Sequence, residues 1–424
     1  MSSVRIRPGP VYGRVRAPPS KSYTHRALVV GHLARRPFRV IRPLDSDDTR
    51  ATAAALHQLG TSVHRGPGAW RLSPSSGRPG SDPVRVQCHE SGTTLRFVSV
   101  LAGLQSRTTL ISGEGRLSAR PIDELLDALG ALGASCRHVR GRGLPIEVRG
   151  PIHGGRISLD ASESSQFASA LLLALPTLDE SSVLELTGTI VSRPYLDATL
   201  AVLAHHRIDV VRQGRRFRIS GRQHFRGTRF VVPGDASSAA YLWAAAAVGG
   251  GRVRVDGVGG SWPQADLAAL GLLEAAGAQV HRWSSGAEVS AGRPKPFSVD
   301  LTDAPDLYSL AGVLAATTTG ESRIVGAEHV VLKESNRRAG TARLARRLGA
   351  KVRETSKGLT IRGTSRPKAL NLPHLSDHRL VMSAAVGALA SSGPSTIGER
   401  QAVRKSYPGF WSAFRGLSEG GSGS

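Results

Sequence analysis

The sequence predicts an α/β protein that consists of about six copies of one repeat, arranged as two lobes of three repeats each. The main observation is a pattern that recurs along the chain: an apolar-periodic helix, a break, a short strand, a tight turn and a second strand. The breaks are separated by 73, 74, 70 and 72 residues, and they fall at Gly60, Gly133, Arg207, Gly277 and Gly349. A glycine at such a break favours the left-handed conformation that ends a helix and leads directly into a strand.

A second helix in each repeat supports the same fold class. These helices follow Ser20, Thr93, Ser165, Ala236 and Asp306. Helices that alternate with strands indicate an α/β fold, and a repeat of this length is too long for one rung of a solenoid. The sixth copy, around residues 382–403, lacks the downstream pair of strands. We therefore expect the N-terminal strand, near residues 11–16, to return to the second lobe and complete that copy.

The crossings of the chain between the lobes set the expected domain boundaries. Two proline-containing segments, near residues 17–19 and 232–234, mark these crossings. The first lobe is then residues 19–233, and the second lobe is residues 1–18 with residues 234–415. Residues 416–424 are expected to be a flexible tail. A cleft between two such lobes is a usual place for a substrate.

The composition narrows the possible partners. The 424 residues include 56 basic and 32 acidic ones, and the net charge of +24 favours anionic ligands such as nucleic acid, a membrane surface or phosphorylated metabolites. Only seven of the basic residues are lysines. Lysine can give up a proton more readily than arginine, so a role in proton transfer is expected for some of Lys21, Lys333 and Lys405.

The cysteines and the hydropathy indicate the cytoplasm. Cys88 and Cys136 are the only cysteines, which is too few for a disulfide framework or a zinc site. The most apolar stretch, residues 239–248, has about half the length that is needed to cross a bilayer. The N-terminus shows no apolar signal region, so secretion is not expected.

Charged and polar side chains gather where the predicted helices begin. Pro18 and Pro19 keep the chain extended, and Ser20 or Ser22 is expected to cap a helix with Lys21 and Arg26 on its first turns. Free N–H groups, the helix dipole and these cations favour a phosphate or a carboxylate. The alternative is an ordinary capped helix with solvated basic residues.

Further clusters of this kind stand at nine other helix starts: residues 44–50, 90–96, 116–121, 162–167, 192–197, 303–306, 333–337, 376–379 and 403–408. Solvated helix ends explain any one of them, but not their recurrence in successive repeats. The cations expected to converge are Lys21, Arg26, Arg120, Arg337, Arg379 and Lys405. Few carboxylates accompany them, chiefly Asp306 and Glu334, which indicates two anionic substrates and proton transfer without a metal.

Together these segments closely resemble the 5-enolpyruvylshikimate-3-phosphate (EPSP) synthase family of the shikimate pathway. The resemblance runs from about Ile6 to Phe414. It rests on Pro19-Ser20-Lys21-Ser22 with Arg26, residues 44–48, Ser91-Gly92-Thr93, Arg120-Pro121, Ser164-Ser165-Gln166, residues 234–238, Lys333-Glu334 with Arg337, Asp377-His378-Arg379 and Lys405-Ser406. It implies a two-domain inside-out α/β barrel of six βαββαβ units, three in each lobe.

The resemblance also implies the reaction, which transfers the enolpyruvyl group of phosphoenolpyruvate to the 5-hydroxyl of shikimate 3-phosphate without a metal or an organic cofactor. Shikimate 3-phosphate is expected on Lys21, Ser22, Arg26, Ser164, Ser165, Ser192, Tyr195, Asp306, His329 and Lys333. Phosphoenolpyruvate is expected on Lys21, Gly92, Arg120, Gln166, Arg337, Arg379 and Lys405. Asp306 would take the hydroxyl proton, and Glu334 with Lys21 would handle the proton at C3. A monomer with no nucleic-acid or membrane partner is expected.

Four residues depart from the pattern of the family: Glu90, His329, Val331 and Asn336. They bear on affinity, pH optimum and sensitivity to glyphosate, a mimic of phosphoenolpyruvate. Three alternatives remain. A related enolpyruvyl transferase acts on UDP-N-acetylglucosamine, but its usual loop cysteine is missing here, where residues 115–121 contain Ser118. The others are an inactive family member and a basic RNA-binding protein, although aromatic residues are only 5% of the chain and form no stacking motif.

Overall fold

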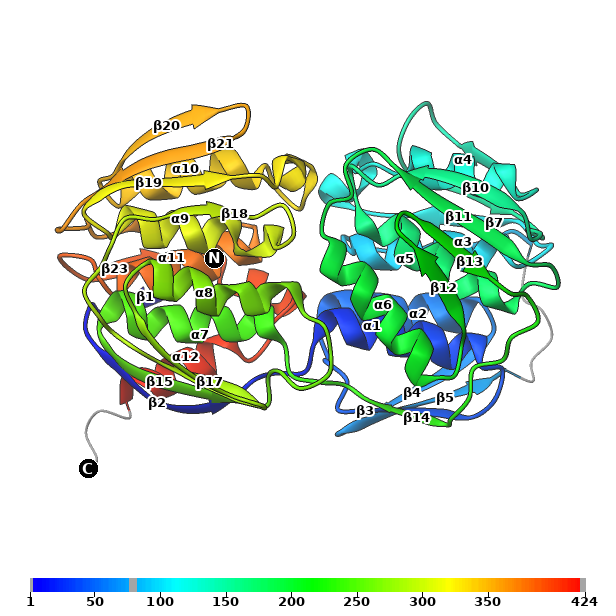
Figure 1. Ribbon diagram of the computed structural model, residues 1–424, viewed down its shortest axis with the longest axis horizontal. Coiled ribbons are helices and arrows are strands. Elements are labelled where there is room, and N and C mark those ends of the chain that lie inside the picture. The colour runs from blue at the N-terminus through cyan, green and yellow to red at the C-terminus, as the bar shows by residue number, and fades with distance from the viewer. Residues whose placement is uncertain (1–2, 76–81, 420–424) are drawn as a thin grey trace. The chain divides into compact units, whose positions relative to one another are not determined.

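The computed structural model describes residues 3–75 and 82–419. The chain divides into two compact lobes: Pro19–Val232 form the first lobe, and Met1–Pro18 with Pro233–Ser424 form the second. Within each lobe, helices lie between small sheets (Figure 1).

Three four-stranded sheets build the first lobe. In order across each sheet, the strands are β14 (Arg229–Val231), β3 (Phe38–Ile41), β5 (Ala69–Pro74) and β4 (Thr61–Gly66); β6 (Val84–Gln87), β7 (Thr109–Ser112), β9 (Ile146–Arg149) and β8 (Ser135–His138); β10 (Arg156–Asp160), β11 (Ser182–Thr187), β13 (Arg216–Ile219) and β12 (Val210–Gln213). The helices are α1 (Lys21–Leu33), α2 (Asp47–Gln58), α3 (Gly92–Gly103), η1 (Gly115–Ala119), α4 (Asp123–Ala131), α5 (Ser165–Ala174), η2 (Leu175–Thr177) and α6 (Arg193–His205).

The second lobe has two four-stranded sheets and one three-stranded sheet. Their strands are β2 (Val11–Arg16), β15 (Gly251–Asp256), β17 (Gly286–Ser290) and β16 (Gln279–Trp283); β18 (Ser298–Asp300), β19 (Gly320–Val325), β21 (Gly358–Gly363) and β20 (Lys351–Thr355); β1 (Val4–Ile6), β23 (Ser395–Ile397) and β22 (Asn371–Leu372). The helices are α7 (Ala236–Gly249), η3 (Ala265–Leu267), α8 (Ala268–Ala275), η4 (Pro305–Leu307), α9 (Tyr308–Ala316), η5 (Glu328–Leu332), α10 (Arg337–Arg347), α11 (His378–Ala388), η6 (Arg400–Lys405) and α12 (Phe410–Glu419).

The predicted repeat is confirmed at its breaks and in its sheets. All five breaks adopt the left-handed conformation, with φ between +59° at Arg207 and +101° at Gly133. Each repeat pairs two strands in parallel, such as β6 with β7 and β18 with β19. All repeats except the sixth then add an antiparallel hairpin to this pair. A left-handed residue is a local requirement of the turn from helix to strand, which explains why the sequence shows it.

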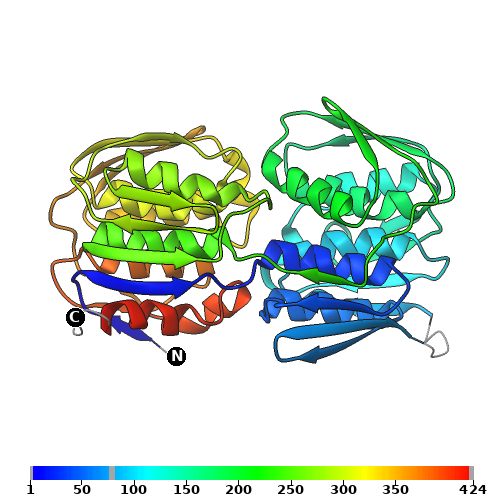
Figure 2. The same cartoon turned by 60° about the horizontal axis from the view of Figure 1, so that its bottom comes forward.

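The N-terminal strand returns to the second lobe as predicted, but the predicted repeat within that lobe is wrong. β2 pairs in parallel with β15 and so begins the fourth repeat, whereas β1 joins the sixth repeat by pairing with β23. Figure 2 shows β2, in blue, between β15 and the red helix α12. Val11, the first residue of β2, is buried. The physical reason is that β15 has an open edge that β2 covers, while the sixth repeat supplies its own parallel strand, β22.

The predicted tail is also partly wrong. Residues 416–419 continue α12, and Leu417 is buried against β2. An apolar residue that packs on the lobe extends the helix beyond the predicted boundary. Residues 420–424 of the predicted tail lie outside the described residues.

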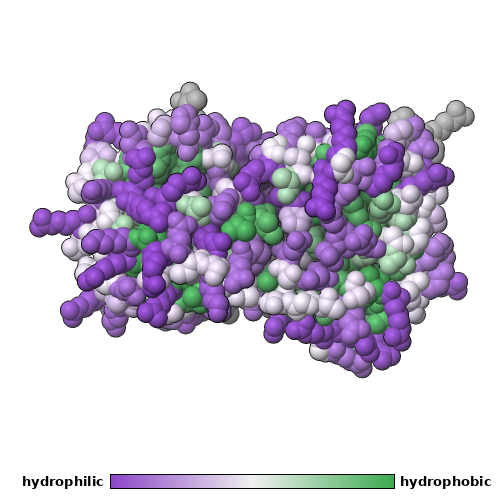
Figure 3. Space-filling view, turned by 90° about the horizontal axis from the view of Figure 1, so that it is seen from above, coloured by the Kyte–Doolittle hydropathy of each residue, from purple (hydrophilic) through white to green (hydrophobic). Residues whose placement is uncertain are grey.

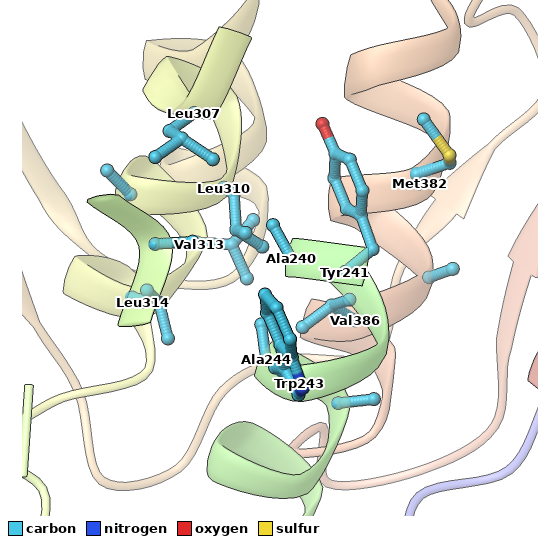
Figure 4. Packing of buried hydrophobic residues seen from close by; sticks show 14 of the residues in the cluster. Ala240, Tyr241, Trp243, Ala244, Leu307, Leu310, Val313, Leu314, Met382 and Val386 are labelled. Carbon is cyan, nitrogen blue, oxygen red and sulfur yellow. The ribbon is translucent and has the colours of Figure 1, made fainter. Parts of the chain in front are cut away.

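The core of the second lobe is built around α7, in which every residue from Ala236 to Ala246 is buried. Figure 4 shows α7 between α9, which contributes Leu310 and Val313, and α11, which contributes Met382 and Val386. The many alanines of α7 let both neighbours approach closely. Burial of each large apolar side chain that packs between these helices contributes roughly 1.5–3 kcal/mol. The packing therefore holds α9 and α11 firmly against α7.

Candidate active site

In the first lobe, side-chain contacts join the N-terminal ends of several helices. Lys21 Nζ on α1 lies 2.9 Å from Asp48 Oδ2 on α2. Thr94 Oγ1 on α3 donates to the carbonyl oxygen of Asp48 at 3.3 Å. Gln166 Nε2 on α5 donates to Thr93 Oγ1 at 3.2 Å. Residues predicted to bind anions therefore gather at one end of the lobe, although they come from four helices in three repeats.

Arg26 links α1 to α6. It is 4% exposed, and its guanidinium donates to Ser22 Oγ at 2.6 Å, the carbonyl oxygen of Tyr195 at 2.8 Å and Thr199 Oγ1 at 2.9 Å. Burial lowers the pKa of Arg26 to about 10, so the side chain remains charged at neutral pH. Its partners are neutral oxygens, and its charge is therefore not cancelled by them.

Gly92 begins α3 directly beside Arg120. A Cβ atom at Gly92 would lie 2.4 Å from Nη1 of Arg120, closer than any real Cβ contact. Beneath them, Arg96 is 2% exposed and donates to the carbonyl oxygens of Gly92 and Pro121. The absence of a side chain at Gly92 thus lets a guanidinium lie against the helix start.

The predicted serines occupy helix starts in different ways. Ser20 stands at the N-cap of α1, but its side chain makes no capping hydrogen bond. Ser164 caps α5 by accepting from the N–H of Gln166, and Ser165 follows it as a buried residue. Ser192 precedes α6 with a φ of +55°, an unfavourable conformation for a residue with a side chain. Ser46 forms a capping box on α2, so part of the 44–50 cluster is structural.

In the second lobe, Arg337 bonds to three carboxylates. Its Nη1 lies 2.7 Å from Asp306 Oδ1, its Nη2 lies 2.5 Å from Glu334 Oε2, and its Nε lies 3.1 Å from Asp377 Oδ2. Arg379 Nη2 adds a contact of 2.8 Å to the other oxygen of Asp306. Both arginines are buried. The structure therefore brings together four of the residues predicted for this lobe: Asp306, Glu334, Arg337 and Arg379.

The arginines control the protonation of Asp306. Burial by itself would raise the pKa of this carboxyl, but Arg379 and Arg337 outweigh burial and hold the pKa well below its ordinary value. Asp306 is therefore ionised at neutral pH. A carboxylate held so firmly is a weak base, because its affinity for a proton is low.

His329 and Lys333 come from η5 and the loop after it. Burial, reinforced by the positive charge of Lys333, lowers the pKa of His329 to about 3, so the imidazole is neutral at physiological pH. Lys333 is half-buried and close enough to Asp306 to lower the pKa of that carboxyl. Lys405 is the last residue of η6 and is half-buried.

Three aspartates were missed as site residues by sequence reasoning. Asp48 pairs with Lys21, as described above. Asp377 accepts from Ser335 Oγ at 2.7 Å and from the N–H of Arg379 at 2.8 Å, in addition to Arg337. All three aspartates stand near a helix start, where an acidic residue normally indicates only a cap.

The third, Asp266, is buried in η3 and accepts a short hydrogen bond from Ser237 Oγ on α7. Burial, together with the nearby Asp306 carboxylate, raises the pKa of Asp266 to about 6. Gln264 in the same turn bridges the carbonyl oxygen of Gly234 and the N–H of Ala236. The turn before η3 therefore holds the start of α7.

The structure shows the surroundings of three departures from the family pattern. Glu90 is exposed, and its Oε1 lies so close to Gly115 that a Cβ there would be 2.3 Å away. Its carboxylate thus faces the start of η1. Asn336 caps α10 by accepting from the N–H of Ala339 at 3.0 Å, a role that aspartate fills equally well. Val331 is half-buried in η5.

The described residues meet neither the requirements of a metal site nor those of a membrane-spanning helix. Over residues 3–75 and 82–419, no three His, Cys, Asp or Glu side chains are arranged to hold a metal ion. No helix in these ranges is both long enough and apolar enough to cross a membrane.

Comparison with known proteins gives a consistent result. Residues 6–414 match the family model described as EPSP synthase (3-phosphoshikimate 1-carboxyvinyltransferase). A 3-phosphoshikimate 1-carboxyvinyltransferase of Halobacterium salinarum (strain ATCC 29341 / DSM 671 / R1) is 39% identical over 97% of this chain and 98% of its own. That of Thermococcus kodakarensis is 40% identical over 96% and 98%. A solved structure of EPSP synthase from Acinetobacter baumannii has a TM-score of 0.81 at 24% identity, over 98% of both chains.

The structural likeness confirms the predicted two-lobed, inside-out α/β fold. The match of the family model covers nearly the whole chain and coincides with the extent of the predicted resemblance. The chain belongs to the EPSP synthase (3-phosphoshikimate 1-carboxyvinyltransferase) family.

Proposed function

We propose that the chain transfers the enolpyruvyl group of phosphoenolpyruvate to the 5-hydroxyl of shikimate 3-phosphate, with release of phosphate, in the biosynthesis of aromatic amino acids. Family membership supports this reaction. The observation that carries the assignment of residues is the buried group of Arg337 and Arg379 with Asp306 and Glu334, since it combines carboxylate-binding cations with two candidate proton carriers.

Phosphoenolpyruvate is assigned to two groups of residues, one for its carboxylate and one for its phosphate. Arg337 and Arg379 would bind its carboxylate, because a guanidinium matches a carboxylate in geometry and charge. Lys21, Arg120, Gln166 and Lys405 would hold its phosphate, with Gly92 leaving room beside Arg120.

Shikimate 3-phosphate is assigned to hydroxyls and to a second set of cations. Its phosphate would bind Ser164, Ser165 and neighbouring N–H groups at the start of α5. The ring would lie against the remaining predicted residues, which are Lys21, Ser22, Arg26, Ser192, Tyr195, Asp306, His329 and Lys333. A neutral His329 can accept or donate a hydrogen bond to a sugar hydroxyl.

Binding of phosphoenolpyruvate would activate the proposed base. A substrate carboxylate that competes for Arg379 and Arg337 takes away part of the positive charge that holds the pKa of Asp306 low. The pKa of Asp306 then rises towards the working pH, and the carboxylate becomes a better acceptor of the 5-hydroxyl proton.

The chemistry follows in two balanced stages. Lys21 or Glu334 protonates C3 of phosphoenolpyruvate while the 5-hydroxyl oxygen attacks C2 and loses its proton to Asp306, which gives a tetrahedral ketal. Loss of phosphate from C2 and of one proton from C3 then forms the enol ether. Glu334 is held by Arg337 at 2.5 Å, so it is oriented for both transfers at C3.

The test is release of phosphate from phosphoenolpyruvate in the presence of shikimate 3-phosphate. Lys21→Met and Glu334→Gln are compared with the matched controls Lys295→Met and Glu328→Gln, which change exposed residues. We expect a loss of turnover of about 10²–10⁴-fold in the first pair only. Turnover equal to that of the controls would refute these roles. No release from the parent enzyme would refute the reaction itself.

We also propose that the chain acts in the cytoplasm as a monomer without an organic cofactor. Two cysteines, one of them buried, and the substrates of a biosynthetic pathway support the location. Size-exclusion chromatography with light scattering tests the oligomeric state.

A further inference from the structure

One surface of the second lobe carries positive charge that nearby acids do not balance. It lies on α10, the edge strand β20, the following turn and β21. We define the basic edge as the exposed residues Arg343, Arg347, Lys351, Arg353, Lys357 and Arg362. Within the part of the chain that the structure describes, none of the six forms an ion pair. The nearby acid Glu354 is bonded to Arg346 at 3.0 Å.

This excess of positive charge is largest in one of the five repeats that carry such a break. Residues 338–368, around the break at Gly349, contain ten basic residues and one acidic residue. The equivalent window around Gly60 contains four basic and no acidic residues, and the window around Gly133 contains four of each. The window around Arg207 contains seven basic and two acidic residues, and the window around Gly277 contains three of each. Since the same elements form in those repeats, the fold does not require the charge.

The basic edge also places like charges next to one another. Lys351 on β20 lies directly opposite Arg362 on β21, and like charges at such positions destabilise a sheet. Arg343 and Arg347 stand four residues apart on α10, where like charges repel as well. Glu321 on β19 faces Arg362 from the other side, but it is accompanied by Arg323 at 3.4 Å. A bound polyanion would remove this repulsion.

The adjacent sheet of the same lobe provides the contrast. Arg252, Arg254 and Arg282 are also surface arginines on strands, but each has a carboxylate partner, at 3.7, 3.1 and 2.7 Å respectively. Figure 3 looks from above onto the side of the lobe that carries β20 and β21 in Figure 1, and hydrophilic side chains project densely from it. The unpaired cations are therefore a property of the basic edge, not of every sheet.

We propose that the basic edge binds the phosphate backbone of nucleic acid without reading its sequence. Lys351 and Arg353 point to the same side of β20, about 7 Å apart, and so form a row along an extended polyanion. Residues 338–368 contain no Phe, Tyr or Trp, so base stacking contributes nothing there. Contacts from arginine and lysine to phosphate position a protein without giving sequence specificity.

The chemistry of the basic edge fits a protein partner or a membrane less well. Protein interfaces are centred on aromatic and apolar residues, and binding to a bilayer surface needs an apolar face. Among the described residues, the exposed large hydrophobic side chains are Tyr12, Val211, Val231 and Val325, and all of them lie outside residues 338–368. The proposal departs from the sequence-based expectation of no nucleic-acid partner. It involves no residue that is assigned to the substrates.

The test measures binding of a labelled duplex of about 20 base pairs by fluorescence anisotropy, at salt concentrations of about 50–200 mM. Each phosphate contact on duplex DNA contributes about 0.9 to the slope of log K against log salt. The triple variant Lys351→Gln, Arg353→Gln, Arg362→Gln should lower this slope by about 2.7. Duplex RNA of the same sequence, in a parallel titration, shows which nucleic acid binds more tightly.

The matched control is the triple variant Arg252→Gln, Arg254→Gln, Arg282→Gln, which removes the same amount of charge from the neighbouring sheet. The proposal expects its slope to change by less than about one contact. Equal weakening in both variants would mean that only net charge matters, and unchanged binding in both would mean that the basic edge is not used. Either result overturns the proposal, as does equally tight binding of poly-glutamate. Phosphate release should be the same in parent and variants, and thermal melting checks that both variants are folded.

Discussion

The two lobes treat their buried cations differently. In the first lobe, Arg26 donates to neutral hydroxyl and carbonyl oxygens, so its charge remains available to attract an anion. In the second lobe, Arg337 and Arg379 are bonded to carboxylates. One lobe thus presents an excess of positive charge that suits phosphate, whereas the other contains a nearly compensated network in which protonation, binding and stability depend on one another.

The largest expected effect follows from removing charge from each lobe. Arg337→Met would leave Asp306, Glu334 and Asp377 without their common partner, and we expect a loss of about 3–5 kcal/mol in the free energy of unfolding. Arg26→Met leaves hydroxyl and carbonyl oxygens without their donor, at a cost of about 1–3 kcal/mol. Chemical denaturation of both variants measures the difference. Equal losses would contradict the contrast between the lobes.

The next effect concerns pH and the second lobe. The pKa of Asp266 is raised to about 6, so the folded state holds this proton more tightly than the unfolded state, and its contribution to stability declines as the pH rises from about 4 to 6. Asp266→Asn should remove that decline and gain about 2–3 kcal/mol relative to the parent at pH 7. Unfolding free energies at several pH values provide the measurement. The same pH dependence in parent and variant would show that Asp266 does not titrate in this range.

A smaller effect is expected at the first-lobe binding surface. Gly92→Ala pushes a methyl group against Arg120, which must move away. The KM for phosphoenolpyruvate should rise on the order of tenfold, while stability changes little. Gly130→Ala is the control, since a Cβ there meets nothing within 4 Å. Steady-state kinetics distinguish the two, and an unchanged KM in Gly92→Ala would place phosphoenolpyruvate elsewhere.

The smallest effect should be the same in both lobes. Ser91 caps α3 and Asn336 caps α10 through neutral side chains. Ser91→Ala and Asn336→Ala should each cost about 1 kcal/mol in the free energy of unfolding. Thermal and chemical denaturation measure both variants. If Ser91→Ala and Asn336→Ala lost very different amounts of unfolding free energy, properties other than charge would also distinguish the lobes.

The fold class could be predicted because its signal is local. The left-handed breaks, such as Gly133 and Gly277, repeat at a fixed period and require particular residues. The pairing of β1 with β23 and of β2 with β15 could not be predicted, because β1 and β2 are short strands and their partners lie hundreds of residues away. Only the completed sheets show which edge each strand covers. Family membership confirms the predicted enzymatic reaction.

The sequence could predict which types of residue form the candidate site, but not which side chains they contact. Arg337 was identified as a cation, yet nothing in its neighbourhood predicts a bond to Asp377, forty residues away. Asp48 and Asp266 resembled ordinary acidic residues at helix starts until the fold placed Lys21 and Ser237 beside them. The roles of the predicted residues in substrate binding stay predictions until they are tested by substitution.

The central claim is that the compensated network of the second lobe transfers protons. Running the reaction in D2O tests it most directly, because a proton added to C3 and then lost from it leaves deuterium in the methylene group of the product. The account predicts deuterium in the product of the parent and of Glu328→Gln, with incorporation slowed by about 10²–10⁴-fold in Glu334→Gln at unchanged affinity for phosphoenolpyruvate. Incorporation by Glu334→Gln at the rate of the parent would contradict it.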